Sequence, residues 1–207
     1  IENKAVDPII PNRLFKNGQL VADFLLFTIL WGAFVAFNIY IPMWAQGLLG
    51  VSALIGGATQ IPGAITNFLG SLVSSRTQLR LGKYRIVTLG TLAFIISFGM
   101  MVLSGVKVSL WVLLLAGAFE GFGLGLSFNV LQISVQKDAE KRDIPIATSF
   151  AYLLRILSQT FMSSIYGVIL SNALNKGIIK SNGQVTIEDL NKLSNSQSVQ
   201  NIPNTPN

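Results

Sequence analysis

The sequence predicts an all-α, polytopic membrane helix bundle, and three observations support this fold class. Only 12% of the 207 residues are charged, whereas a soluble domain carries about 25%. The mean hydropathy is +0.57. The apolar residues fall in separate segments whose lengths, at ~1.5 Å per residue, suit a hydrocarbon core about 30 Å thick. We therefore expect a membrane protein with five spanning helices.

The expected spans follow a polar lead-in, residues 1–19, and precede a polar extracytoplasmic loop or tail, residues 175–207. The spans cover about residues 20–45, 52–75, 86–104, 109–136 and 144–172. Within the tail, residues 186–193 have the pattern of a short helix, because Thr186 and Asp189 form a start that resembles a capping box. The first residue is not Met and the chain ends in a polar segment, so we expect a piece of a longer protein.

Signals for helix packing and bending are concentrated in the second span. Gly56, Gly63 and Gly70 repeat at a spacing of seven, which lets a neighbouring helix approach closely. Pro62 lies inside the same span and predicts a kink. The span ends at a basic stretch, RTQLRLGKYR (76–85), which we expect to form a loop.

The basic residues predict the orientation of the chain, because they cluster in segments on one side of the expected membrane. The set comprises Lys4, Arg13 and Lys16 in the lead-in, Arg76, Arg80, Lys83 and Arg85 in the second loop, and Lys137, Lys141 and Arg142 in the fourth. The positive-inside rule places these segments and the N-terminal end in the cytoplasm, and the C-terminal tail outside. The second loop is open to two interpretations. It is a topology signal alone, or a latch whose charged pairs break when the protein changes conformation.

Composition excludes several kinds of site. The chain has no Cys and no His, so disulfides, thiol chemistry and Cys/His zinc sites are ruled out. We expect no metal, no cofactor and no enzymatic activity. The net charge of +6 does not indicate a nucleic-acid partner, because the basic residues lie between apolar segments and not along one surface. A group that binds protons must therefore be a carboxylate or an unusual Lys.

The fourth span carries an ionisable residue, Glu120, close to its middle. Carboxylates inside membranes are costly and usually face a bundle interior or a water-filled cavity. Two stripes accompany it: small residues at a spacing of four, Gly117, Gly121 and Gly125, and polar residues at a spacing of seven, Glu120, Ser127 and Ser134. Glu120 is thus a candidate proton-binding carboxylate beside a solute pathway, or a structural residue paired with a basic neighbour.

The fifth span presents a polar face. Its members fall together when the helix is stepped at ~100° per residue: Thr148, Tyr152, Arg155, Gln159, Ser163 and Tyr166. Arg155 and Glu120 each lie ~15 Å deep in their spans, so they could meet. A pair would keep Glu120 ionised, whereas an unpaired Glu120 could bind and release a proton. Arg155 is therefore a second proton-coupling candidate, unless it braces helices through backbone carbonyls or reaches the inner interface.

Other side chains are candidates for the wall of a substrate cavity. The first span places three of them, Trp31, Phe34 and Asn38, on one face together with Phe27. Such a face suits a large apolar or cationic compound or, alternatively, packing against lipid or another helix. Asp23, nearer the cytoplasm, is expected at the interface and not buried. The full set of cavity candidates is Trp31, Phe34, Asn38, Gln60, Asn67, Ser127, Tyr152 and Gln159.

Short motifs along the chain match those of one known family. DPIIPNRLF precedes the first span, LGKYR follows the second, and GFGLGLSFNVLQISVQ lies in the fourth. The pattern Q-x-x-x-G-x-S-x-x-x-x-G-x-x-x-x-P is formed by Gln46, Gly50, Ser52, Gly57 and Pro62. Ser149 and Arg155 complete the set. These stretches resemble the C-terminal half of the drug:proton antiporters with about fourteen helices in the major facilitator superfamily. Where that family commonly has a Gly-Gly pair after the Arg, this sequence has Leu157, Ser158 and Gln159.

The resemblance implies a multidrug exporter of the plasma membrane that exchanges small-molecule substrates for protons. This chain would be its C-terminal half, without the last helix. The expected partners are the substrate, protons, the lipid bilayer and the N-terminal half of the same transporter. Two alternatives stay open. One is an importer or a lipid exporter on the same scaffold. The other is a non-transporting membrane sensor or scaffold, in which Glu120 and Arg155 form a fixed pair.

Overall fold

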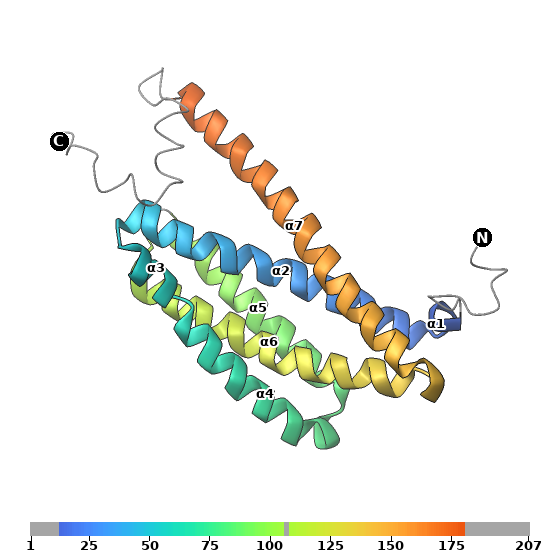
Figure 1. The fold of residues 1–207 in the computed structure, drawn as a ribbon. Helices are drawn as coiled ribbons and strands as arrows, with labels where there is room; N and C mark the ends of the chain where they lie inside the picture. The colour runs from blue at the N-terminus through green and yellow to red at the C-terminus, as the bar shows by residue number, and fades with distance from the viewer. Residues whose placement is uncertain (1–12, 106–107, 181–207) are drawn as a thin grey trace.

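The computed structural model describes residues 13–105 and 108–180, which fold into helices joined by short turns (Figure 1). The helices are α1 (Arg13–Lys16), α2 (Gly18–Leu49), α3 (Ala53–Ala58), α4 (Ile61–Leu81), α5 (Lys83–Ser104), α6 (Leu110–Asp138), the short 3-10 helix η3 (Lys141–Asp143) and α7 (Ile144–Lys180). No strand occurs within these two ranges. The predicted all-α class is confirmed.

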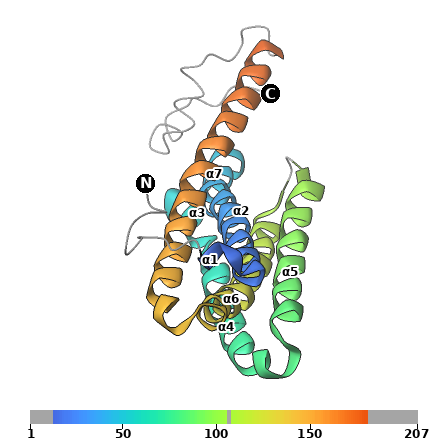
Figure 2. The ribbon, with the colours of Figure 1, turned by 90° about the vertical axis from the view of Figure 1, so that its right-hand side faces the viewer.

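Helix α6 is the central element. It packs against α2, α4, α5 and α7, and Figure 2 shows α5 and α7 on opposite outer sides of the bundle. The main apolar core joins α2, α5 and α6 through side chains such as Phe27, Ile86 and Val130, all of them buried. In a bilayer, close van der Waals packing and not water exclusion holds such helix contacts together.

Helices α4 and α6 approach each other very closely. A Cβ atom placed on Gly121 would overlap the carbonyl oxygen of Gly63, and one placed on Gly125 would overlap that of Asn67. Glycine therefore permits this spacing where a larger residue would not. Thr66 adds a hydrogen bond, because its Oγ1 donates to a carbonyl oxygen of α6 at 2.7 Å. The close contact expected from the glycine repeats is confirmed at these positions.

The second predicted span is not one helix. α3 ends at Ala58, Thr59 and Gln60 form a turn, and α4 begins at Ile61. Pro62 stands in the first turn of α4, where the missing N–H of proline leaves no intrahelical bond unmade. Thr59 and Gln60 keep right-handed helical dihedral angles, so the helix is interrupted directly before Pro62, where the sequence predicts a kink.

The basic stretch 76–85 is helical and not a loop. α4 runs to Leu81 and α5 starts at Lys83, so Gly82 alone joins them. Gly82 has a φ of 75°, a left-handed backbone that favours glycine. The expected loop is wrong because the chain continues as a helix up to the one residue that can reverse it.

The two ends of the described chain also extend beyond expectation. The lead-in contains a short helix, α1, whose Leu14 is buried in a cluster with residues of α2, α6 and α7. α7 continues to Lys180, past the expected end of the fifth span. Its C-terminal half leaves the rest of the bundle (Figures 1 and 2). The short helix expected at residues 186–193 lies outside the described residues.

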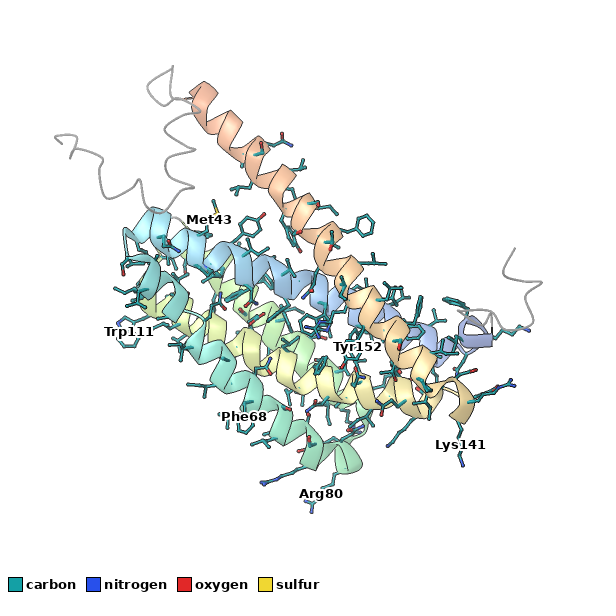
Figure 3. All side chains as sticks on the ribbon, in the orientation of Figure 1. Met43, Phe68, Arg80, Trp111, Lys141 and Tyr152 are labelled. Atoms are coloured by element: carbon teal, nitrogen blue, oxygen red, sulfur yellow. The ribbon has the colours of Figure 1, made fainter. Side chains whose placement is uncertain are left out.

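Within residues 13–105 and 108–180, four helical segments are long and apolar enough to cross a membrane, by length and composition: Gly18–Gln46, Lys83–Ser104, Leu110–Asp138 and Lys141–Ala173. α4 is not among them, and a fifth crossing by this helix stays a prediction. Figure 3 shows Arg80 and Lys141 at one end of the bundle and Met43 and Trp111 at the other. We call the first of these the basic end.

Candidate functional site

Glu120 lies inside the bundle, where it is only 3% exposed. It is ten residues after the start of α6 at Leu110, which corresponds to ~15 Å along the helix. Its Oε2 lies 3.9 Å from the position that a Cβ would take at Gly63, so the glycine on α4 leaves room for the carboxylate. Its Oε1 has no hydrogen-bond partner among the described residues. A buried carboxylate at such depth is rare and commonly functional.

Glu120 and Arg155 do not pair. Both side chains are described, and no ion pair joins them. Glu120 borders α4 near Gly63, whereas Arg155 on α7 reaches Trp31 of α2. Their similar depths allowed a pair, but the two side chains meet different neighbouring helices.

Arg155 instead lies over an aromatic ring. Its guanidinium carbon is 3.7 Å from the centre of the Trp31 ring, a favourable cation–π contact. Trp31 is 7% exposed and meets Phe34 and Phe128 edge to face, with ring centroids 5.0 and 5.7 Å away. Phe27 joins the same group at 5.8 Å from Phe128. Packing against α6 therefore accounts for much of the aromatic face of the first predicted span.

Three polar candidates, on α2, in the turn before α4 and on α4, have different surroundings. The Gln60 side chain donates a hydrogen bond to the backbone carbonyl of Asn38 at 3.2 Å, and the Asn38 amide donates to the carbonyl of Phe34 in its own helix at 3.0 Å. Asn67 is half-buried on α4, and its carbonyl oxygen borders Gly125 of α6. The Gln60 side chain thus ties the start of α4 to α2, whereas the Asn38 side chain bonds within its own helix.

The remaining candidates lie apart from one another. Ser127 of α6 is fully buried against Gly90 of α5, and its Oγ has no hydrogen-bond partner among the described residues. On α7, Tyr152 is 40% exposed (Figure 3) and Gln159 is half-buried. The stripe of Glu120, Ser127 and Ser134 on α6 therefore meets three different sets of neighbours among the described residues.

Helices α2 and α7 pack through small residues. Ser158 is buried, and its Oγ donates to the carbonyl oxygen of Thr28 at 2.5 Å. Gly32 faces Met162, whose Cγ lies 2.7 Å from the position of an added Cβ. The sequence departs from the family's Gly-Gly pair at this point of α7, and the glycine that allows the close approach stands on α2 instead.

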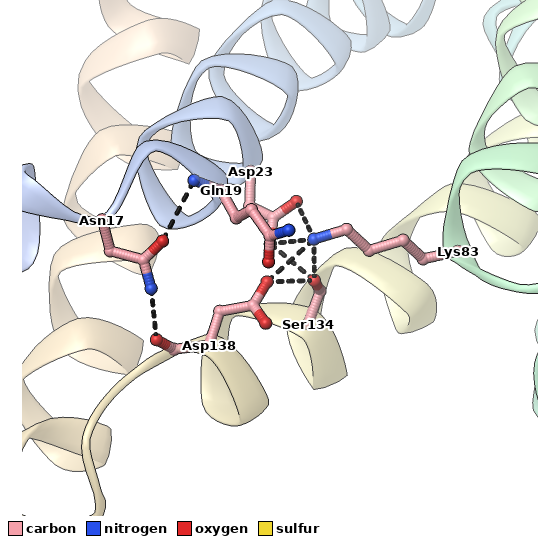
Figure 4. A network of polar contacts seen from close by, with 6 residues as sticks. All are labelled: Asn17, Gln19, Asp23, Lys83, Ser134 and Asp138. Atoms are coloured by element: carbon pink, nitrogen blue, oxygen red, sulfur yellow. Dashed lines mark hydrogen bonds and ion pairs between the residues drawn. The ribbon is translucent and has the colours of Figure 1, made fainter.

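A charged network joins α2, α5 and α6 at the basic end (Figure 4). Lys83 Nζ lies 3.2 Å from both carboxylate oxygens of Asp23 and 2.8 Å from Oδ2 of Asp138. It also donates to Ser134 Oγ at 2.7 Å, and Ser134 Oγ lies 2.5 Å from Asp23 Oδ2. Asp23 is 2% exposed, so the expectation that it is not buried is wrong. The ammonium group of Lys83 compensates the buried carboxylate.

A cavity of about 350 Å³ opens beside this network. It is lined by Gln19, Gln78, Gly82, Lys83, Tyr84, Ser134, Lys137 and Asp138. The other basic residues of the predicted loop, Arg76, Arg80 and Arg85, are exposed. The predicted basic set therefore divides, because Lys83 turns inward to two carboxylates and the three arginines face outward.

The sequence interpretation missed the network, although its members left signals. Asp23 and Lys83 lie near the starts of α2 and α5, and Asp138 ends α6. Ser134 belonged to the polar stripe. Three charged residues near the ends of three spans could have been placed at one membrane level. Which helix faces turn toward one another depends on packing, which periodicity does not specify.

Comparison with known families identifies the type of protein. The sequence model of the Major Facilitator Superfamily matches residues 2–163. The chain belongs to this superfamily. The Major Facilitator Superfamily comprises membrane transporters and not enzymes, so the chain is part of a multi-pass membrane protein.

Relatives of this Major Facilitator Superfamily chain include efflux proteins. It is 29% identical over 177 residues to Multidrug resistance protein 3 of Bacillus subtilis (strain 168), covering 83% of this chain and 34% of the relative. It is 28% identical over 173 residues to Multidrug transporter protein MdtP of the same organism, covering 83% and 32%. The Aspyridones efflux protein of Neocamarosporium betae is 26% identical over 174 residues, covering 84% and 31%. The chain thus spans about a third of the length of these relatives.

Proposed function

We propose that the protein to which this chain belongs exports drugs or other amphipathic organic compounds in exchange for protons. The observation that carries the proposal is Glu120, a buried carboxyl in a helix long enough to span a membrane, with no ion pair to Arg155. Removing a carboxylate from water without a counter-charge is costly, and proton uptake neutralises it. Glu120 is therefore suited to bind and release a proton as its surroundings change.

The relatives support export as the direction of transport. The names of several of them refer to multidrug resistance, multidrug transport or efflux. This chain would supply the C-terminal half of the transporter. It would form one wall of a cavity near the membrane midplane, with the N-terminal half as the other wall. Transport would follow alternating access, in which the two halves rock around the substrate.

The charged network gives this proposal a conformational element. Lys83, Asp23 and Asp138 hold the ends of α5, α2 and α6 together at the basic end. The positive-inside rule puts this end in the cytoplasm of a plasma-membrane protein. Because all its members lie in this half, the network would hold the half together as a unit while the two halves rock. The exposed Arg76, Arg80 and Arg85 would act as the topology signal.

The test is export of a fluorescent amphipathic dye from cells that express the full-length protein. We expect Glu120→Gln to abolish export, or to leave an export rate that no longer changes with external pH, because the amide cannot bind the proton. Wild-type export should increase as the external pH falls, since a steeper inward proton gradient drives it. Dye accumulation measured at several external pH values reads out both effects.

The matched control is Glu140→Gln. Glu140 is exposed, and among the described residues it pairs only with Arg142, whose Nε lies 3.1 Å from it, so its substitution should leave export and pH dependence unchanged. Surface labelling should show equal amounts of both variants in the membrane. Normal export with normal pH dependence in Glu120→Gln would overturn the role of Glu120, and no wild-type dye export at any pH would overturn the proposed function.

A further inference from the structure

Arg155 has a feature that proton coupling does not use. Its guanidinium group, which carries five N–H donors, makes no hydrogen bond or ion pair with another described side chain or carbonyl. Its position is nevertheless fixed, because the Trp31 ring lies 3.7 Å from its central carbon. Arg155 thus contacts an aromatic ring, and its N–H groups make no hydrogen bond to the described residues.

Arg155 lies deep in its helix, where a positive charge normally faces an opposite charge or a polar group. Arg155 follows the first residue of α7, Ile144, by eleven positions, about 17 Å along the helix. α7 itself has no Asp or Glu. The single carboxylate of α2, Asp23, already forms an ion pair with Lys83. A charge at such depth does not face lipid alone; it faces protein, a polar cavity or a bound anion.

The surroundings favour a ligand over a structural brace. A bracing arginine would donate to backbone carbonyls, as Ser158 does one turn further along α7, and Arg155 does not. Its side chain is half-exposed, with the exposed Tyr152 before it and the half-buried Gln159 after it on the same helix face. A ring against the flat side of a guanidinium leaves the N–H groups at its edge free for two parallel hydrogen bonds to a carboxylate.

We propose that Arg155 and Trp31 form a subsite for the acidic group of an amphipathic substrate, an inference that rests on the proposed export function. The carboxylate would accept two hydrogen bonds from the guanidinium edge, and the apolar body of the substrate would lie along the exposed surface of α7. The transporter would then accept weak organic acids in addition to neutral or cationic compounds. The rival occupant, a carboxylate elsewhere in the full-length protein, is separated from the substrate by the experiment below.

The experiment measures equilibrium binding to the purified full-length protein in lipid nanodiscs, without a proton gradient. The probes are a carboxylate-bearing aromatic dye and its methyl ester, which differ only at the acidic group. We expect the wild type to bind the acid about ten-fold more tightly than the ester, since charged hydrogen bonds are worth this much or more. Arg155→Gln should remove this preference and leave the affinity for the ester unchanged.

Two further variants complete the design. Arg155→Lys keeps the charge but loses the paired donors, so the preference for the acid should become intermediate. Arg142→Gln, at an exposed arginine of the turn before α7, should behave as wild type. Unchanged ester binding shows that each variant is folded.

Equal binding of acid and ester by the wild type would overturn the proposal. An Arg155→Gln protein that still prefers the acid would also overturn it. So would loss of both ligands by Arg155→Gln together with a wild-type preference in Arg155→Lys, which is the result expected if Arg155 pairs with a carboxylate of the protein. Because binding is measured without a gradient, a loss of proton-dependent export in cells would count against the proposed function alone.

Discussion

At the scale of single residues, Lys83 determines whether a buried carboxylate is tolerated. Its ammonium group contacts Asp23, which is 2% exposed, and Asp138, which is 21% exposed. Removing one partner of a buried ion pair leaves an uncompensated charge, which typically costs about 3 to 5 kcal/mol. We expect Lys83→Met to lower the free energy of unfolding by an amount near the lower of these values, because 19% of the Lys83 side chain is exposed. The measurement is the melting temperature of the purified full-length protein.

The matched control for Lys83→Met is Arg142→Met. This substitution also breaks an ion pair, but Arg142 and Glu140 are 66% and 63% exposed, and exposed pairs contribute about 0 to 1 kcal/mol. A clear drop in melting temperature for Lys83→Met alone supports the burial argument. Similar small changes in both variants would show that Asp23 does not depend on Lys83.

The sequence could identify the important residue types but not their partners. Glu120 was singled out because a carboxylate in an apolar span is conspicuous, and the structure places it in the interior. Asp23 was expected at the interface because it lies near the start of its span. Its burial follows from Lys83, sixty positions away. A contact of that range depends on how helices pack, and no local pattern of residues encodes it.

At the scale of the helices, the α4–α6 contact depends on glycine. An alanine at Gly121 would place its Cβ against the backbone of Gly63, and backbone atoms cannot move aside without separating the helices. We expect Gly121→Ala to lower the melting temperature and to reduce transport, since Glu120 lies in the same contact. Thermal unfolding in detergent, followed by a transport measurement, tests both effects.

Gly99 provides the comparison for Gly121. It also lies inside a helix, α5, but a Cβ there would meet nothing within 4 Å. Gly99→Ala should be neutral or stabilising by up to about 1 kcal/mol, because alanine has the higher helix propensity. Equal destabilisation by the two substitutions would mean that the close approach of α4 and α6 has no special weight.

The glycine spacing located a helix contact correctly, whereas the basic residues did not mark a helix end. The repeats through Gly63 and Gly121 located the close approach, because small residues at helical spacing have one main use in membrane helices. The basic stretch 76–85 predicts a loop, whereas α4 continues through it to Leu81. Basic residues are good helix formers, and the chain turns only at Gly82.

At the scale of the whole molecule, composition was enough for the fold class, whereas the topology that the charge distribution predicts stays a prediction. Both are sums over many residues and tolerate local errors. The arrangement of the helices was not accessible in the same way. The other described residues leave most of α7 uncovered, and the chain spans about a third of the length of its relatives. What packs against the exposed part of α7 therefore cannot be read from the described residues.

The topology can be tested with single cysteines, because this chain has none. The full-length protein, with any other cysteine replaced, would carry Cys at one of four exposed positions: Ser52, Arg80, Ser109 or Lys141. If the basic end is cytoplasmic, a membrane-impermeant maleimide added to intact cells should label positions 52 and 109, and should label 80 and 141 only after permeabilisation. Positions 52 and 80 flank α3 and α4, so labelling of both from the same side would show that this segment does not cross the membrane. Labelling of position 141 in intact cells would reverse the orientation and place the Lys83 network outside the cell.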